Sequence, residues 1–543
     1  MQPLVSAMST FRKAFVNAIV KSLLRGKSLI QAILAYWVSP LMPNATVNGE
    51  IVGQKRKSLQ DFLKDAEAAL LGPISGEGLV QLSANLRTQF IEGLRTNKQC
   101  MLPSYSHQLP LGEEAGQFVA LDVGGSTLRV ALVELRGRDV EESKQTEILS
   151  MRNFRIGKDI KDLEGMEFFY WMATKIGETL AAGLKQPTSD KVIPAALAWS
   201  FPIEQTSLGS GTLQAMGKGF LADSGLVGKD LADIVNSACA AKGINVQLQA
   251  ILNDSSACLL SRAYSHPSTR FGLILGTGVN IAAYLPVDTM GLDKFGIRPE
   301  GWFDEAKHVI VNTELGMFGT GILPVTRWDA QLLEQHPRPD FQPLEHMVSG
   351  MYLGEIVRLV MIEAIETCGL LGGILPASLE TNYTLGTDTI SMIEADTSSD
   401  LAEAIQLFAE RHPSPHTPTS ADLQAIKSIS SFVSVRSSAL VASCVYTLWS
   451  VRLEAEAEFL ATLDSTSELR KAVEADIELE KTTVAFNGSV IENYPGYLDG
   501  CQRYIKELLQ GNESTKARSI ELVPAKESSL TGAAVALACI GNQ

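Results

Sequence analysis

The spacing of apolar residues changes along the chain from a helical to a strand-like pattern. From about residue 50 to residue 96, apolar side chains recur every three or four positions, which predicts helices with one buried face. Near Gln117 the pattern changes, because FVALDVGG is a continuous apolar run that ends in two glycines and leads directly into TLRVALVEL. This arrangement predicts two buried strands joined by a tight glycine turn.

The same strand, glycine turn and strand occur again about 150 residues later, in FGLILGTGVNIAAYL. Between the two copies, residues 166–184 have helical spacing, whereas VIPAALAWSFP and VQLQAILND look like buried strands. Strands that alternate with helices are typical of α/β proteins. We therefore predict an α/β fold with two related lobes around a cleft.

The second half of the chain contains two long helical patterns, at residues 347–370 and 424–463. Residues 384–422 are rich in Ser, Thr, Asp and Pro, which predicts an irregular surface segment. TVAFNGSV predicts another strand with a glycine turn, and SSLTGAAVALACI a closing helix. The expected regions are an N-terminal extension at 1–49, a helical segment at 50–110, a small lobe at 111–250 completed by the helix at 528–543, and a large lobe at 251–527.

Composition narrows the class of protein. The chain has 543 residues, 45% hydrophobic and 20% charged, as expected of a soluble globular enzyme. Its net charge of −15 argues against general nucleic-acid binding, which needs a basic face. Seven scattered cysteines without a CxxC pair predict a reduced, cytoplasmic compartment rather than a disulfide framework. The histidines lack metal-ligand spacing, so no protein-bound metal site is expected.

The first 49 residues are basic and contain no acidic residue. Four apolar residues at intervals of four would form one face of a helix with basic flanks. Such a helix is typical of attachment to an anionic membrane surface, and we expect residues 1–45 to reach the mitochondrial outer membrane. A helix packed on the body of the protein explains the pattern equally well. The apolar residues are Phe11, Phe15, Ile19 and Leu23, and the basic residues are Arg12, Lys13, Lys21, Arg25 and Lys27.

Three short segments carry candidate chemistry. In residues 122–127 (DVGGST), glycines let the backbone approach a polyphosphate and the hydroxyls add donors. The turn at 276–278 (GTG) has the same character. Asp254 follows a predicted strand and precedes a predicted helix, where a carboxylate could take a proton from an acceptor hydroxyl. The alternative is that Asp254 only caps the helix.

The order of the segments makes a stronger case than any segment alone. LDVGGSTLRVALVEL, LAWSFPIEQTSLGSGTLQAMGKGF, ILNDSSACLL, LILGTGVNIAAYL, VNTELGMFG, FQPLEHMVSGMYLGEIVRLV, VAFNGSV and SSLTGAAVA together resemble the hexokinase family from about Gly116 to the end. The resemblance implies an actin-like ATPase fold, in which two α/β lobes close over sugar and ATP. It also implies that Mg²⁺ and ATP are used to phosphorylate the 6-hydroxyl of a hexose-type sugar, with no covalent enzyme intermediate.

The resemblance assigns roles residue by residue. Asp254 is similar to the general base that takes the proton of the 6-hydroxyl, and Lys218 is the second expected catalytic residue. The implied sugar contacts are Ser200, Gly217, Lys218, Asn253, Asp254, Asn280, Glu314 and Glu345. The implied ATP contacts are Asp122, Gly124, Gly125, Ser126, Thr127, Arg129, Thr277, Gly488 and Ser489.

Several positions depart from the pattern of the glucose-type members. Those members usually have Asn in place of Thr127, Trp-Thr in place of Met216-Gly217 and an aromatic residue in place of Leu315. They also have Asp in place of Asn487 and a more glycine-rich turn in place of residues 527–529. In these respects the chain is similar to the fungal N-acetylglucosamine kinases and to atypical fungal hexokinase-like proteins.

The departures leave the exact activity open. Loss of a hydroxyl at Gly217 changes which sugar hydroxyls are paired, and a smaller residue there leaves room for a 2-acetamido group. Leu315 is expected to offer that group an apolar surface. We therefore expect N-acetylglucosamine to be slightly preferred over glucose. The alternatives are a weakly active or inactive regulator of carbon-starvation responses that still binds sugar, and a bifunctional protein that phosphorylates sugar and docks on mitochondria.

Overall fold

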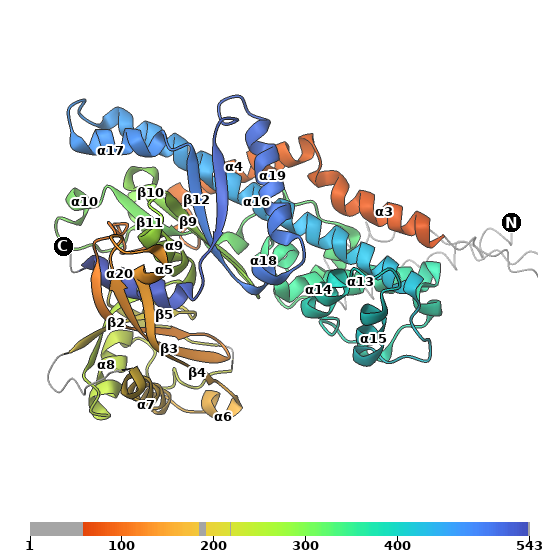
Figure 1. Cartoon of the computed structure of the whole chain (residues 1–543), viewed down its shortest axis with the longest axis horizontal. Coiled ribbons are helices and arrows are strands. Elements are labelled where there is room, and N and C mark those ends of the chain that lie inside the picture. Colours follow the sequence, from red (N-terminus) through yellow and green to blue (C-terminus); the bar gives the residue numbers. More distant parts are fainter. Residues whose placement is uncertain (1–57, 184–191, 218, 541–543) are drawn as a thin grey trace, which may run out of the picture. The chain divides into compact units, whose positions relative to one another are not determined.

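The computed structural model describes residues 58–183, 192–217 and 219–540, which are built around two large β-sheets (Figure 1). A small third sheet pairs β6 (Ile203–Gln205) with β7 (Gly211–Leu213). All the described residues belong to one compact unit, which comprises residues 57–543. The predicted basic extension at 1–49 and the expected catalytic Lys218 therefore lie outside the described residues.

The first sheet has five strands in the order β4-β3-β2-β5-β8. A tight hairpin joins β2 to β3, and β5 and β8 continue the sheet in parallel with β2. The glycine hairpin predicted from FVALDVGG is thereby confirmed, whereas β4 was not predicted. The strands are β2 (Ala115–Val123), β3 (Thr127–Arg136), β4 (Thr146–Arg155), β5 (Ile193–Trp199) and β8 (Val246–Leu252).

Both faces of this sheet are buried, because successive side chains on a strand point to opposite sides. Val119 and Leu121 share one hydrophobic core with α7 (Met166–Gly183) and α8 (Leu231–Ala241). Ala120 lies in a different core, shared with α9 (Asp254–Ser265) and α20 (Ser528–Ile540). Small residues on β2 and on α20 let this helix approach the sheet closely.

The second sheet has six strands in the order β1-β11-β10-β9-β12-β13. The second predicted glycine hairpin is confirmed as β9 and β10, which pair antiparallel. Helix α9 packs on β9, β10 and β12 as well as on α20, so it lies between this sheet and α20. The strands are β1 (Leu102–Pro103), β9 (Thr269–Leu275), β10 (Val279–Pro286), β11 (His308–Asn312), β12 (Lys481–Asn487) and β13 (Ser519–Pro524).

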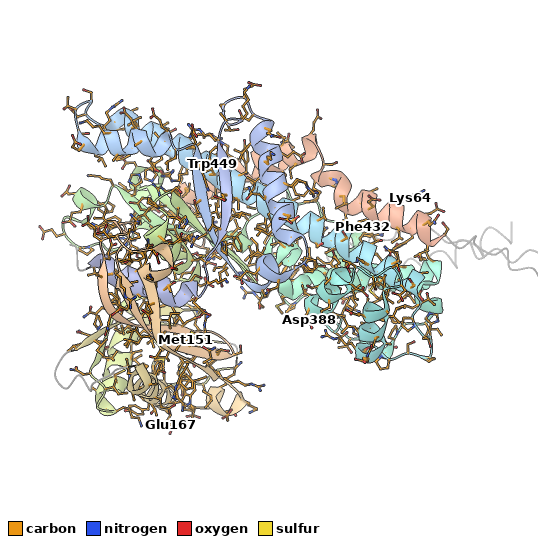
Figure 2. The ribbon with its side chains drawn as sticks, viewed as in Figure 1. Lys64, Met151, Glu167, Asp388, Phe432 and Trp449 are labelled. Carbon is orange, nitrogen blue, oxygen red and sulfur yellow. The ribbon has the colours of Figure 1, made fainter. Side chains whose placement is uncertain are left out.

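The 43-residue helix α16 (Ser420–Thr462) forms the centre of the largest core, with β10, α3 (Leu59–Leu71) and α4 (Glu77–Arg95) packed against it. It confirms the long helix predicted at 424–463. Its composition would allow it to cross a membrane, but 78% of its most apolar window is buried inside the protein. Trp449 lies on this helix (Figure 2). Its indole N–H donates to the hydroxyl of Thr482 at 3.0 Å. We conclude that α16 is a core helix.

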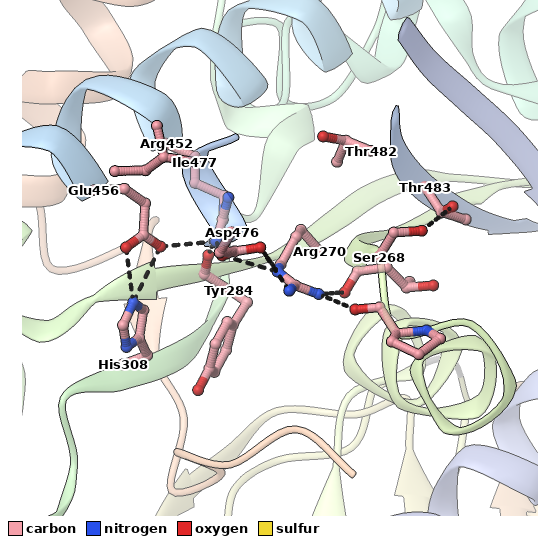
Figure 3. Close-up of polar contacts among 12 residues, drawn as sticks. Ser268, Arg270, Tyr284, His308, Arg452, Glu456, Asp476, Ile477, Thr482 and Thr483 are labelled. Carbon is pink, nitrogen blue, oxygen red and sulfur yellow. Dashed lines mark hydrogen bonds and ion pairs between the residues drawn. The ribbon is translucent and has the colours of Figure 1, made fainter. Parts of the chain in front are cut away.

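A buried network of charges ties the end of α16 to the six-stranded sheet (Figure 3). Arg452 donates to Glu456 at 2.7 Å and also pairs with Asp476 on α17 (Glu468–Ile477), which Arg270 of β9 holds at 2.6 Å. Burial by itself would raise the pKa of Asp476, but Arg452 and Arg270 outweigh it and hold that pKa below its ordinary value. His308 of β11 closes the network against Glu456 at 2.9 Å.

The prediction of an irregular surface segment at 384–422 was wrong. This segment contains α14 (Thr387–Ala395) and α15 (Ala402–Arg411), and Ile390, Ile393 and Phe408 are fully buried against the long helices. Its polar composition hid a few well-spaced apolar anchors. The other α-helices of the described residues are α5 (Glu142–Gln145), α6 (Lys158–Lys161), α10 (Trp302–Glu305), α11 (Arg327–Gln335), α12 (Glu345–Val348), α13 (Gly350–Cys368), α18 (Ser489–Asn493) and α19 (Tyr497–Gln510).

The contact between α20 and α9 yields a stability test. A Cβ on Gly532 would lie 1.9 Å from the carbonyl oxygen of Ala257, so the Gly532→Ala variant must push the two helices apart. Ala normally stabilises a helix relative to Gly by about 1 kcal/mol, but overpacking costs about 1–3 kcal/mol, so we expect net destabilisation. Denaturant unfolding of both proteins measures the difference.

Gly511 provides the matched control. It is the C-cap of α19, its φ is −70°, and a Cβ there would meet no atom closer than 3.5 Å among the described residues. The Gly511→Ala variant should therefore be neutral or slightly stabilised. Equal stability of the Gly532→Ala variant and the wild-type protein would contradict the close packing of α20 on α9.

Candidate active site

The junction between β8 and α9 places two polar side chains at the start of a buried helix. Asn253 is the N-cap of α9, and its side-chain oxygen accepts a hydrogen bond from the N–H of Ser255 at 2.9 Å. Asp254 is the first helical residue, and its carboxylate accepts from the same N–H at 2.8 Å. The sequence allowed Asp254 to be the helix cap, but Asn253 fills that role in the structure. The carboxylate of Asp254 is therefore not needed for capping.

A chain of side-chain amides extends from Asn253 across the six-stranded sheet. The amide of Asn280 donates to Asn253 at 3.3 Å and to Asn312 at 2.8 Å, and Asn312 donates to the carboxylate of Glu314 at 2.8 Å. Glu314 has φ 50°, a strained conformation for a residue with a side chain, and such strain clusters at functional sites. The structure thus brings together the predicted Asn253, Asn280 and Glu314.

The electrostatic setting of Asp254 is unusual. Burial raises the pKa of its carboxyl to about 6, and the negative charges of Asp122 and Glu314 act in the same direction, against the hydrogen bond from Ser255. Burial also raises the pKa of Glu314, although Asn312 partly offsets this effect. A carboxyl group with a pKa near neutrality can take up a proton during a reaction and release it afterwards.

The first glycine turn joins β2 to β3. The N–H of Gly124 donates to the carbonyl of Thr127 at 3.0 Å, and the carbonyl of Ser126 accepts from Ile156 at 2.8 Å. These bonds fix the ends of the turn, while Gly125 and Ser126 make its tip. The predicted phosphate-binding residues 124–127 therefore form one compact turn at the edge of the five-stranded sheet.

The second glycine turn, at 276–278, is held by the neighbouring helices. The carbonyl of Gly276 accepts from Gly350 at 2.8 Å, and the N–H of Met351 donates to the carbonyl of Thr277 at 3.3 Å. The carboxylate of Glu345 accepts from the N–H of Val279 at 3.0 Å. Thr277 itself remains exposed. Glu345, predicted as a sugar contact, thus also fastens this turn.

A third turn, at Gly488-Ser489, packs against the second one. A Cβ on Gly488 would lie 2.3 Å from the carbonyl oxygen of Leu275, so this position accepts only glycine. The side chain of Asn487 donates to the carbonyl of Ala525 at 3.1 Å, which ties the turn to the segment before α20. The predicted ATP contacts Thr277, Gly488 and Ser489 are therefore neighbours.

Two residues of this neighbourhood were missed by the sequence analysis. The hydroxyl of Thr387, at the start of α14, donates to the carbonyl of Gly350 at 2.6 Å and accepts from Gly354 at 2.9 Å. Asn312 links Asn280 to Glu314. Asn312 lies within the motif VNTELGMFG and could have been chosen from it, whereas Thr387 lies in the segment that was predicted to be irregular.

Arg129 of β3 is surrounded by carboxylates. It donates to Asp122 at 2.9 Å through Nε and pairs with it again through Nη2, while Nη1 donates to Glu527 at 2.9 Å. Asp122, at the end of β2, was predicted to lie on the ATP side, and so was Arg129. The structure shows that the charge of Arg129 is shared between two acidic side chains.

The segment that resembles the sugar-binding motif begins after β5. The N–H of Ser200 donates to the carbonyl of Val123 at 3.3 Å, which places Ser200 beside the end of β2. Gly217 has φ 64°, and among the described residues, its chain neighbours aside, no atom lies within 4 Å of the position that a Cβ would take. Met216 and Leu315 are both buried. The expectation that Leu315 offers a surface to the sugar was therefore wrong, because its side chain belongs to the core.

Together, these features describe a site for group transfer between two bound molecules. A buried carboxylate of raised pKa lies next to amide side chains that suit a polyhydroxylated ligand. Three turns rich in glycine expose backbone and hydroxyl groups that suit phosphates.

Comparison with known proteins agrees with this description. Two hexokinase family models match the chain, at residues 71–264 and 270–539. Hexokinase-2, chloroplastic, from Nicotiana tabacum is 33% identical over 440 residues, which are 80% of this chain and 81% of that protein. Hexokinase from Kluyveromyces lactis is 29% identical over 446 residues, which are 81% of this chain and 84% of that protein.

A solved structure agrees as well. The hexokinase from Schistosoma mansoni complexed with glucose is 26% identical, with a TM-score of 0.69 over 89% of this chain and 100% of that chain. The predicted actin-like ATPase fold is thereby confirmed, and so is the activity class, a phosphotransferase that phosphorylates sugars. The resemblance to the fungal N-acetylglucosamine kinases stays a prediction. The chain belongs to the hexokinase family of sugar kinases.

Proposed function

We propose that this protein transfers the γ-phosphate of ATP to the 6-hydroxyl of a hexose, with Asp254 as the general base. The observation that carries the proposal is the carboxyl of Asp254, whose pKa is raised to about 6 by burial and by the charge of Asp122. At neutral pH this group is ionised and can accept the proton of the attacking hydroxyl. Asn253, Asn280 and Glu314 would hold the sugar hydroxyls next to it.

The donor set fits Mg²⁺ carried in by the nucleotide. Within residues 58–183, 192–217 and 219–540, no cluster of three or more His, Cys, Asp or Glu residues could hold a metal ion. Mg²⁺ is usually held by one or two carboxylates together with substrate phosphates, and Asp122 provides such a carboxylate beside the first glycine turn. The charge of Arg129 is neutralised by its two acidic partners, so the ion would supply the positive charge that the phosphates need.

The first prediction for this mechanism concerns Asp254. The variants Asp254→Ala and Asp254→Asn should lose about 10²–10⁴-fold in kcat, because a positioned base contributes about that much. In the wild-type protein, kcat/KM should fall as the pH drops below about 6, where the carboxyl takes up a proton. A coupled assay across pH 5–8 measures both effects.

Folding is the control for this experiment. The raised pKa means that ionising Asp254 at neutral pH costs more free energy in the folded protein than in the unfolded chain. The Asn variant avoids this cost and should therefore be at least as stable as the wild-type protein. The variant Asp499→Asn removes an exposed carboxylate from the first turn of α19 and should leave activity unchanged, with a loss of stability of at most about 1 kcal/mol. Wild-type turnover in both Asp254 variants would show that the base lies elsewhere.

We propose further that N-acetylglucosamine is the preferred sugar. Open space at Gly217, in the motif that resembles the sugar-binding segment, supports this choice, since a 2-acetamido group is larger than a hydroxyl. Glucose is the competing candidate, because the similar hexokinase from Schistosoma mansoni is described with glucose bound. Failure to phosphorylate either sugar would favour the role of a sugar-binding regulator.

The choice of sugar can be tested at Gly217. We expect kcat/KM to be higher for N-acetylglucosamine than for glucose, and the Gly217→Thr variant to shift the ratio toward glucose. Thr is strained at φ 64°, so the variant needs a control for strain. Gly225 has φ 70° and equally open surroundings, so the Gly225→Thr variant should carry similar strain without a shift in the ratio. A wild-type preference for glucose would contradict the proposal.

The cellular location is a separate proposal. We propose a cytoplasmic protein that attaches to the mitochondrial outer-membrane surface through residues 1–45, supported by the acid-free, basic sequence of this segment.

A fluorescent fusion should move from mitochondria to the cytosol when residues 1–45 are deleted. The same shift is expected when Arg12, Lys13, Lys21, Arg25 and Lys27 are changed to Gln, because the charges provide the attraction. Sugar phosphorylation should persist in both variants, since none of the predicted site residues lies there. An identical distribution of all three proteins would refute the attachment.

A further inference from the structure

Glu527 is a residue of this site to which neither the sequence nor the comparisons give a role of its own. It lies in the turn between β13 and α20, and its carbonyl accepts from the N–H groups of Leu530 and Thr531 at 3.1 and 3.0 Å. Its φ of 49° is in the left-handed region, which costs free energy for a residue with a Cβ. Strain of this kind persists where the surrounding structure holds the residue in place, often at functional sites.

The side chain of Glu527 contacts the arginine of the first phosphate hairpin. Its carboxylate accepts from Nη1 of Arg129 at 2.9 Å, while Asp122 occupies the Nε side of the same guanidinium. The hydroxyl of Ser529 approaches Nη2 at 3.4 Å. Two carboxylates around one guanidinium leave this group with a net charge of −1, which opposes the approach of a polyphosphate.

The turn that carries Glu527 is fastened to the opposite side of the predicted nucleotide site. Ala525 donates to the carbonyl of Phe486 at 2.8 Å and accepts from the side chain of Asn487 at 3.1 Å, next to the turn at 488–489. The ion pair between Arg129 and Glu527 therefore joins the hairpin of the five-stranded sheet to the turns of the six-stranded sheet.

The ion pair between Arg129 and Glu527 is partly exposed, so another anion can replace Glu527 at little cost. The Arg129 side chain is 27% exposed and the Glu527 side chain 39% exposed, and ion pairs so near to water are weak. A phosphate oxygen can therefore replace the Glu527 carboxylate at Nη1, while the two contacts with Asp122 keep the guanidinium oriented.

We infer that Glu527 is a positioning residue that holds Arg129 in the absence of nucleotide and releases it to the phosphates of the bound nucleotide. The inference rests on the proposed use of ATP. Glu527 thereby weakens nucleotide binding, because each binding event must first break its bond to Arg129. It also keeps Arg129 from pairing elsewhere when the site holds no phosphate.

The test is the affinity for Mg-ATP of the wild-type protein and of the Glu527→Gln variant, measured by calorimetry without sugar. Gln keeps the size of the side chain and removes its charge. We expect the variant to bind Mg-ATP about threefold to fivefold more tightly, the range of a partly exposed ion pair. The difference should shrink at high ionic strength, which screens such pairs.

Two further variants separate this role from a structural one. Glu521→Gln removes a partly exposed carboxylate that pairs with Lys481 on the neighbouring strand, and it should leave the affinity unchanged. In an Arg129→Gln background, Glu527→Gln should have a smaller effect on nucleotide affinity, because the bond that the nucleotide must break is gone and only the repulsion between the carboxylate and the phosphates remains. A structural effect of Glu527→Gln would instead persist in full in that background.

The outcomes are distinguishable. Equal or weaker binding of Mg-ATP by the Glu527→Gln variant would overturn the inference while leaving the proposed function intact. The same would follow if the change in affinity were equal in both backgrounds. If the wild-type protein bound no nucleotide, with or without Mg²⁺, the proposed use of ATP would fail and the inference with it.

Discussion

The site depends on the burial of one carboxylate, Asp254, at the start of a helix held between two layers. Helix α9 packs on the six-stranded sheet on one side and on α20 on the other, and this packing fixes the position of its first residue. The start of a helix favours a negative charge, but burial and the charges of Asp122 and Glu314 outweigh that effect for Asp254. The fold thus gives this carboxyl a pKa close to neutrality, which suits the base that we propose.

Much of the surrounding structure supports this arrangement. Gly532 brings α20 into contact with Ala257 of α9, and Asn253 caps the helix so that the carboxylate of Asp254 is left for chemistry. The amides of Asn280 and Asn312 connect that cap to Glu314, whose strained backbone turns its side chain into the same group. Glycine turns from both sheets form the predicted phosphate side, where Asp122 and Glu527 compensate the charge of Arg129.

The parts that sequence could predict are those with a strong local pattern. The two glycine hairpins, α7 and α16 follow from apolar spacing, and the Asp254 segment follows from its motif. The contact between Arg129 and Glu527 could not be predicted, because 398 residues separate them and neither carries a local signal of the pairing. Helix α14 was missed because its neighbours are polar, although Ile390 and Ile393 anchor it in the core. The burial of Leu315 was missed since a motif does not show which way a side chain points.

The most direct test of this account is the titration of the Asp254 carboxyl itself. Infrared difference spectroscopy of the wild-type protein, with the Asp254→Asn variant as reference, isolates this one group without any substrate. The account predicts a pKa of about 6, and a lower value in an Asp122→Asn background, where one of the two neighbouring negative charges is gone. A pKa at the ordinary value for aspartate, unaffected by the change at Asp122, would contradict the claim that the fold prepares Asp254 as the base.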